Sequence, residues 1–164
     1  MMDGTRRSFD LEAIRADFPI LSREVHGKPL VYLDSAASAQ KPAQVLDALM
    51  SAYQDTYANV HRGLHFLSEA STDLYEAVRG KVAGFIGAAS GDEIVLTSGA
   101  TMSLNLIARC WAQPRLQPGD EILISIAEHH ANIVPWQMVA EATGARVRAF
   151  TLEDDGAFSM ARLK

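Results

Sequence analysis

The sequence predicts an α/β fold with a mainly parallel sheet and flanking helices. Short apolar runs rich in β-branched residues alternate with longer segments in which apolar residues recur every third or fourth position. Turn-forming Gly, Pro and Asp residues separate the two kinds of segment. With 164 residues, of which 48% are hydrophobic, the chain has enough apolar material for one core.

The first half of the chain is predicted to be mainly helical. A helix is expected over residues 11–18, ending before a proline, and a short strand over 31–34. Pro42 suits the first turn of the next helix, whose apolar face repeats every fourth residue from Val45 to Tyr57. A longer apolar stripe predicts a buried helix from about Ser68 to Ile86.

The second half is predicted to supply the parallel sheet. EIVLT at 93–97 and EILISI at 121–126 are expected to be neighbouring buried strands, joined by a helix over 102–111 in a right-handed crossover. A helix over 135–143 should lead to a further strand, RVRAF, at 146–150. Because a parallel sheet needs cover on both faces, we expect it to continue in residues beyond these.

Composition excludes several classes of protein. The 15 Lys and Arg residues are scattered among 20 acidic ones, so neither nucleic acid nor an anionic membrane is an expected partner. The polar start MMDGTRRSFD leads into no apolar run long enough for a signal peptide or a membrane span. Cys110 is the single cysteine, and we expect it to be buried in its helix. These features favour a cytoplasmic protein.

The turn from Ser98 to Thr101 is a candidate phosphate site. It lies between a predicted strand and the start of a helix, where free backbone N–H groups and the helix dipole favour an anion. Gly99 permits close approach of the backbone, and the Thr101 hydroxyl is an additional donor. The alternative for this turn is an ordinary helix cap.

His129 follows the predicted strand at 121–126, and ligands of open α/β sheets bind outside the carboxyl ends of strands. Its ring is suited to stack on a planar cofactor, to ligate a metal or to transfer a proton. A loop histidine bonded to a carbonyl group is the alternative.

His61 and His65 are spaced by four, which raises the question of a metal site. Gly63 between them weakens a helix, so this spacing need not put both rings on one face, and no metal site is predicted. His61 and Arg62 are instead candidate donors to a carboxylate, and the alternative for Arg62 is a surface ion pair.

Four segments occur in the order and spacing of the sulfur-mobilisation (Suf) type of cysteine desulfurase, which the chain resembles over nearly its whole length. This group lies within the class V aminotransferase-like enzymes. The segments are REVHGKPLVYLDSAASAQKP, YANVHRGLHFLS, TSGAT followed by LNLIA, and EHHANIVPWQ.

The resemblance implies the fold type I of enzymes that use pyridoxal 5'-phosphate (PLP). Residues 21–164 would form the N-terminal part of the PLP-binding large domain, and residues 1–20 an N-terminal helical arm. The implied enzyme is a homodimer that converts L-cysteine to L-alanine and an enzyme persulfide. Its sulfur would serve iron–sulfur cluster assembly, with a sulfur-acceptor protein as a partner.

By the same resemblance, cofactor-binding roles fall on Ala100 and Thr101, at the phosphate, and on His129, which would stack on the pyridine ring. Two loops would line the substrate entrance near the dimer interface. They contain Asp34, Ser35, Ala36 and Ala37 in the first loop, and His61, Arg62 and His65 in the second.

The chain departs from the family pattern in ways that bear on catalysis. Residues 98–102 read Ser-Gly-Ala-Thr-Met where the family has Arg-Gly-Thr-Thr-Glu, which removes one phosphate-facing hydroxyl and two charges. The Schiff-base lysine and the persulfide cysteine of the family have no counterpart, so no catalytic residue is assigned and the chain alone is predicted to be inactive. The lysines present are Lys28, Lys41, Lys81 and Lys164.

Two other functions are compatible with these residues. One is a related PLP-dependent lyase, such as a selenocysteine lyase. The other is a non-catalytic module that keeps the interface helices of the fold and docks on an intact desulfurase.

Overall fold

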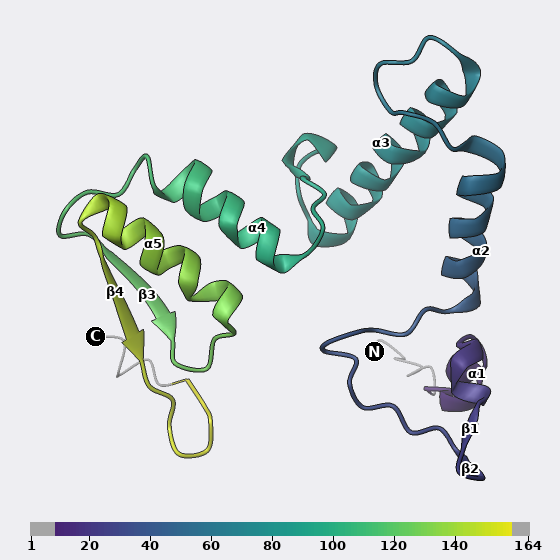
Figure 1. Ribbon diagram of the computed structural model, residues 1–164, viewed down its shortest axis with the longest axis horizontal. Helices are drawn as coiled ribbons and strands as arrows, with labels where there is room; N and C mark the ends of the chain where they lie inside the picture. The colour runs from purple at the N-terminus through teal and green to yellow at the C-terminus, as the bar shows by residue number, and fades with distance from the viewer. Residues whose placement is uncertain (1–8, 159–164) are drawn as a thin grey trace, which may run out of the picture. The chain divides into compact units, whose positions relative to one another are not determined.

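The computed structural model describes residues 9–158, and Figure 1 shows its helices and strands. The chain divides into two compact units, the first ending at Glu93 and the second beginning at Ile94. Each unit is described by itself below.

The first unit begins with helix α1 (Leu11–Ala16) and a 3-10 turn over Pro19–Ser22. The Asp10 carboxylate caps α1 by accepting a hydrogen bond from the backbone nitrogen of Ala13 at 3.0 Å. A small hairpin that the sequence analysis missed follows, formed by β1 (Glu24–Val25) and β2 (Lys28–Pro29). Its two turn residues, His26 and Gly27, both have positive φ angles, as a tight primed turn requires.

The strand predicted at residues 31–34 is absent from the structure. The segment has no neighbouring strand to pair with, and a side chain holds its backbone instead. The Tyr32 hydroxyl lies 3.1 Å from the carbonyl oxygen of Asp34 and 2.6 Å from that of Ser38. This prediction was therefore wrong. A segment with high β-propensity forms a strand only where a partner strand is available to pair with it.

Two longer helices complete the first unit. Helix α2 (Ala43–Ser51) starts after Pro42, as predicted, and continues into a π-helical turn over Ala52–Thr56. The backbone nitrogen of Ala43 donates to the Asp17 carbonyl oxygen at 2.8 Å, which joins α2 to the end of α1. Helix α3 (Phe66–Ile86) ends at Gly87, whose left-handed φ of 76° terminates the helix. A 3-10 turn over Gly91–Glu93 packs against α3.

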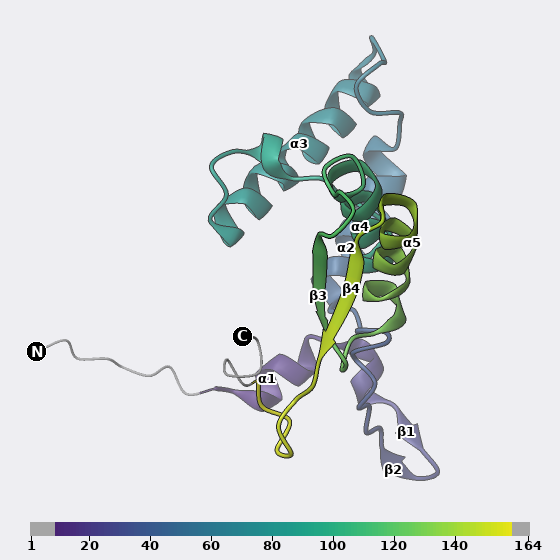
Figure 2. The same ribbon diagram turned by 90° about the vertical axis from the view of Figure 1, so that its left-hand side faces the viewer.

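The second unit contains a two-stranded parallel sheet. Strand β3 (Glu121–Ser125) pairs with β4 (Arg146–Phe150), with Glu121 opposite Arg146. Helix α5 (Val134–Thr143) connects the strands, lies alongside the sheet and stops at Gly144, which has a φ of 77° (Figures 1 and 2). Both strands and the helix between them match the sequence prediction, and their parallel pairing is that of a crossover unit.

The first predicted crossover of this unit is not formed. Residues 94–97 have no regular secondary structure and belong to no sheet, so the helix that follows them does not join two paired strands. That helix consists of α4 (Ala100–Leu106) and a π-helical turn, η4 (Ile107–Ala112). The prediction of a strand at 93–97 was wrong for the same reason as at 31–34, since β3 has β4 as its only partner among the described residues.

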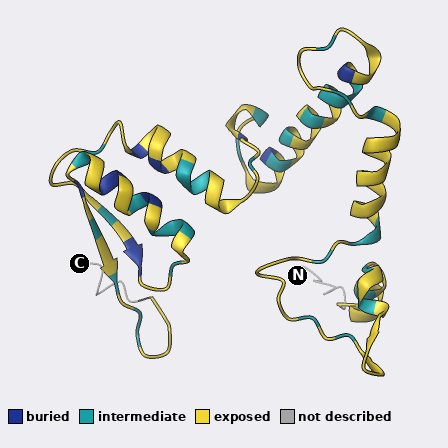
Figure 3. Cartoon of the chain, viewed as in Figure 1, coloured by how far each residue is buried: buried dark blue, intermediate teal, exposed yellow. Residues whose placement is uncertain are grey.

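The core of the second unit lies between η4 and α5. Ala108, Ala112 and Val139 are buried there, and Figure 3 shows buried positions on both helices. Cys110 is exposed, contrary to the prediction, because Ala108 and Ala112 occupy the face that packs on α5 and Cys110 lies midway between them. Trp136 and Ile122 pack partly buried against this cluster.

Several large apolar side chains are almost fully exposed in the first unit. Leu33 is 91% exposed, Leu64 99% and Phe85 91%, so these side chains are not part of a core within the described chain. Among residues 9–158 no helix is both long and apolar enough to cross a bilayer.

Candidate functional site

The turn before α4 is formed around Gly99. Gly99 is the N-cap residue of α4 and has a φ of 146°, a conformation that residues with a Cβ rarely adopt. A Cβ at Gly99 would meet no atom within 4 Å. The backbone angle, and not crowding, is therefore what makes glycine suitable at this position.

Side chains on either side of Gly99 hold the turn. The hydroxyl oxygens of Thr97 and Ser103 lie 2.7 Å apart, and the Ser103 hydroxyl also donates to the Gly99 carbonyl oxygen at 3.4 Å. The backbone nitrogen of Ser103 donates to the same carbonyl at 3.1 Å and thereby begins the helical hydrogen bonding. Hydrogen bonds within the chain therefore hold this turn.

The first turn of α4 presents a set of hydrogen-bond donors. The backbone N–H groups of Ala100, Thr101 and Met102 precede the first helical hydrogen bond, so none of them has an acceptor within the helix. The Thr101 side chain is exposed, and its hydroxyl has no hydrogen-bond partner in the described part of the chain. Residues 97–103 contain no carboxylate. This donor set is chemically suited to an anion.

His129 lies just after β3, in the tight turn that leads to α5. Its Nδ1 atom accepts a hydrogen bond from the backbone nitrogen of Ala131 at 3.1 Å, so in the neutral ring the proton is on Nε2. The rings of His129 and His130 lie edge to face, with 6.1 Å between centroids. The following 3-10 turn (His130–Asn132) packs against α4. Thr101 and His129 thus belong to neighbouring elements of one unit, and their facing a common cavity stays a prediction.

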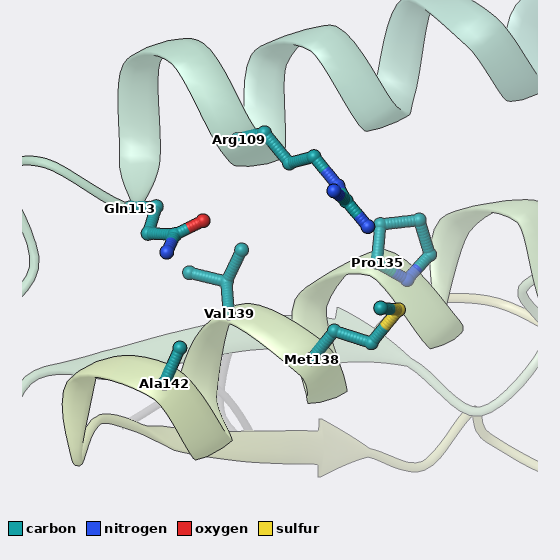
Figure 4. A pocket seen from close by; sticks show the side chains of 6 residues that line it. All are labelled: Arg109, Gln113, Pro135, Met138, Val139 and Ala142. Atoms are coloured by element: carbon teal, nitrogen blue, oxygen red, sulfur yellow. The ribbon is translucent and has the colours of Figure 1, made fainter.

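Two hollows of the second unit are lined by neither Thr101 nor His129. One of about 190 Å³ lies between η4 and α5, and Figure 4 shows Arg109 and Gln113 reaching across it toward α5. A second, of about 330 Å³, lies beside β3 and β4 and is lined in part by Glu128, Asn132 and Trp136. The second hollow therefore touches the residues on both sides of the His129 turn.

The first predicted entrance loop, Asp34 to Ala37, is an exposed turn of the first unit. The backbone nitrogens of Ala37 and Ser38 donate to the Asp34 carbonyl oxygen at 3.2 and 3.1 Å. Ser35 lines a hollow of about 320 Å³ together with residues of α1 and its following turn. The turn is thus locally ordered and accessible to solvent.

In the second predicted entrance loop, His61 lies against α3. Its φ is 68°, its backbone nitrogen donates to the Thr72 hydroxyl at 2.9 Å, and its Nε2 atom lies 3.6 Å from the Glu76 carboxylate. His65 is engaged elsewhere, since its Nδ1 atom accepts from the backbone nitrogen of Ser68 at 3.4 Å and caps α3. The two histidines face different partners, and no cluster of three or more potential metal ligands occurs in residues 9–158.

Arg62 is exposed at the tip of this loop. The alternative of a surface ion pair is not supported, because none of the ion pairs formed within the described chain includes Arg62. Its guanidinium group is therefore available to an external carboxylate.

Ser68, a residue that was not predicted to have a role, fixes this loop. Its side chain is buried, with the residue 1% exposed, and its hydroxyl donates to the Asn59 carbonyl oxygen at 2.6 Å and accepts from the Gly63 backbone nitrogen at 3.1 Å. These two bonds bracket His61 and Arg62. The residues one turn along the helix, Ser71 and Thr72, are polar as well, so the sequence carries no signal that distinguishes Ser68.

A second missed feature is a chain of side-chain hydrogen bonds around His129. The Asn132 amide nitrogen donates to the Glu128 carboxylate at 2.9 Å, and the Trp136 indole nitrogen donates to the Asn132 amide oxygen at 2.8 Å. The signal in the sequence was the spacing of four between successive polar partners.

Comparisons with known proteins agree on one family. The aminotransferase class-V family matches residues 31–164. A cysteine desulfurase of Pectobacterium atrosepticum is 54% identical over 156 residues, which cover 95% of this chain and 38% of that protein. The chain therefore spans well under half the length of this relative.

Two solved structures extend the comparison to the fold. The cysteine desulfurase CsdA of Escherichia coli is 47% identical with a TM-score of 0.73, over 89% of this chain and 35% of that one. The apo structure of a cysteine desulfurase from Thermococcus onnurineus is 36% identical with a TM-score of 0.82, over 93% of this chain and 36% of that one.

Proposed function

The chain belongs to the aminotransferase class-V family, and we propose that it forms the N-terminal portion of a PLP-dependent cysteine desulfurase. The observation that carries this proposal is the 54% identity to a cysteine desulfurase over 95% of the chain. The whole enzyme would convert L-cysteine to L-alanine and retain the sulfur as a persulfide.

The finer assignments form part of the same proposal. The segments LDSAASAQKP and EHHANIVPWQ support the sulfur-mobilisation type, with sulfur destined for iron–sulfur clusters through an acceptor protein. We also propose a cytoplasmic homodimer, in which residues 1–20 form a helical arm and residues 21–164 belong to the large domain.

PLP is the cofactor of this family, and the residues at the start of α4 fit its phosphate group. Three N–H groups without helical acceptors and the unpartnered Thr101 hydroxyl supply four hydrogen-bond donors with no carboxylate among them, as a dianionic phosphate requires. When bound, PLP supplies an electron sink for chemistry at the substrate carbon.

The residues of this chain would bind and orient the reactants. Ala100 and Thr101 would hold the phosphate, and His129 would stack against the pyridine ring with its imidazole fixed by Ala131. Arg62, held in an ordered loop, would donate to the substrate carboxylate together with His61. The residues from Asp34 to Ala37 and His65 would complete the entrance.

None of the lysines Lys28, Lys41, Lys81 and Lys164 lies in a segment that matches the family's Schiff-base lysine segment, so we assign the role of the covalent cofactor lysine to none of them. The Lys41 ammonium group donates to the Ala39 carbonyl oxygen at 2.5 Å. Reversible cofactor binding without turnover is therefore the function proposed for these 164 residues alone.

A titration with PLP tests the cofactor site. We expect saturable binding that inorganic phosphate competes away, and a several-fold weaker affinity in Thr101→Val, which keeps the shape of the side chain and removes its hydroxyl. His129→Ala should also weaken binding, whereas the matched control His130→Ala should not. Equal affinity in all four proteins would contradict the assignment.

A further inference from the structure

We propose that Asn132 is a positioning residue for His129. It acts through the hydrogen bonds that join the side chains of Glu128, Asn132 and Trp136. These hydrogen bonds support a positioning role for Asn132 whether or not the chain binds a cofactor. Its relevance to the cofactor rests on the proposed function.

The direction of each hydrogen bond in this chain is determined by chemistry. The Trp136 indole nitrogen can only donate, so the group that faces it at 2.8 Å must be the amide oxygen of Asn132. The amide nitrogen of Asn132 then faces the Glu128 carboxylate at 2.9 Å and donates to it. All three side chains are partly buried. Asparagine is suited to this position because it accepts on one side and donates on the other.

The chain of bonds closes around the turn that carries His129. Glu128 immediately precedes His129, and Asn132 follows it by three residues, so their side-chain bond spans the turn from outside. Inside the turn, the backbone nitrogen of Asn132 donates to the His129 carbonyl oxygen at 2.8 Å. The Ala131 nitrogen donates to the His129 ring at 3.1 Å. Backbone and side-chain hydrogen bonds therefore both hold the turn from Glu128 to Asn132 in place.

Trp136 connects this turn to the core of the unit. It lies on α5 and packs against the buried cluster of Ala108, Ala112 and Val139. Through the indole N–H group, the position of Asn132 depends on the core rather than on the exposed turn alone. Because the turn is fixed, the Ala131 nitrogen stays within reach of Nδ1, and the His129 proton stays on Nε2.

The decisive substitution is Asn132→Asp, which keeps the size of the side chain and the acceptor for Trp136. It removes the donor to Glu128 and places two carboxylates together. The double variant Glu128→Gln/Asn132→Asp restores the bond with its direction reversed, since a glutamine amide donates to the new aspartate. Gln137→Glu, an exposed amide-to-carboxylate change on α5, is the matched control for added charge.

Two NMR signals report the position of the turn. The ring nitrogen shifts of His129, assigned with His129→Gln, give the tautomer at alkaline pH, where imidazole is neutral. The indole proton of Trp136 reports its hydrogen bond through its exchange with solvent, and Trp111 is an internal reference. A residue that contributed only to stability would change neither the tautomer nor the relative exchange of these protons.

We expect wild type to show one tautomer, protonated on Nε2, and Asn132→Asp to show a mixture. The exchange of the Trp136 indole proton should become about tenfold faster, and the double variant should recover to within about twofold of wild type. Gln137→Glu should match wild type. An unchanged tautomer in Asn132→Asp, or no recovery in the double variant, overturns the inference.

If Asn132→Asp does not fold, Trp136→Phe is the second test. It removes the hydrogen bond between the indole and Asn132 and keeps an aromatic ring. It should also mix the tautomers of His129, and an unmixed tautomer there counts against the inference. PLP titration of the same proteins keeps the two proposals separable. Tautomer changes as expected, with no PLP binding even by wild type, would support Asn132 as a positioning residue and refute the proposed cofactor site.

Discussion

The hydroxyl of Ser68 accepts a hydrogen bond from the backbone nitrogen of Gly63 at 3.1 Å, and a Cβ on Gly63 would lie only 2.3 Å from the Ser68 side chain. The loop that presents Arg62 is therefore packed so closely on α3 that only glycine fits at its end.

The first prediction is that Gly63→Ala destabilises the first unit. The added methyl group must displace Ser68, which is buried, and break its bond to the loop; overpacking of this kind costs about 1–3 kcal/mol. Urea unfolding followed by circular dichroism measures the change. Gly80→Ala is the matched control, because its added Cβ meets no atom within 4 Å in the middle of α3. The control should gain roughly 0.5–1 kcal/mol from helix propensity.

The second prediction concerns the hydroxyl that the phosphate turn lacks. Ala100→Thr places a donor on the first residue of α4, next to the three free N–H groups. A hydrogen bond to a charged group contributes about 1.5–3 kcal/mol, so PLP affinity should rise by roughly tenfold or more. Ala100→Val has the same shape without the hydroxyl and should not bind more tightly. Equal affinities for the threonine and valine variants would show that the side chain at position 100 does not face the phosphate.

The outcomes of the sequence predictions differ between strands for a physical reason. Residues 121–125 and 146–150 form strands where they were expected, because each provides the hydrogen-bonding partner of the other. The segments at 31–34 and 93–97 have comparable propensity but no partner strand within residues 9–158, and local side-chain bonds hold them instead. Propensity is local, whereas pairing depends on other parts of the chain.

In the candidate site, too, some features were predicted from the sequence and others were missed. The helix start at Gly99 and the turn at His129 were predicted, because caps and strand ends are recognisable in a local pattern. Asn132 and Ser68 were missed as anchors, because their roles depend on the direction of side chains on folded elements. Cys110 was placed on the wrong face because its apolar neighbours did not reveal which helical face meets α5.

The third prediction is that the 164-residue chain self-associates or is only marginally stable. Leu64 is 99% exposed and Phe85 91%, and burying such side chains between copies removes apolar surface from water. Sedimentation velocity at increasing protein concentration should show larger species. The variant Leu64→Ser/Phe85→Ser should shift the distribution toward monomer. A compact wild-type monomer with cooperative unfolding would contradict this prediction.

The last prediction is that the 164-residue chain mixed with PLP forms no alanine from cysteine above the free-cofactor background. Thr101 and His129 can hold and orient a cofactor, but neither bonds to it covalently nor accepts sulfur from the substrate. No lysine of the chain matches the family's Schiff-base lysine segment, and Cys110 lies on the face of η4 away from the core contact with α5. PLP absorbance should therefore be lost on dialysis, and alkylation after incubation with cysteine should detect no persulfide on Cys110. Cys110→Ser is the control for that labelling. Alanine above background in wild type that disappears in His129→Ala would show that these residues are catalytic by themselves and that the covalent lysine is dispensable.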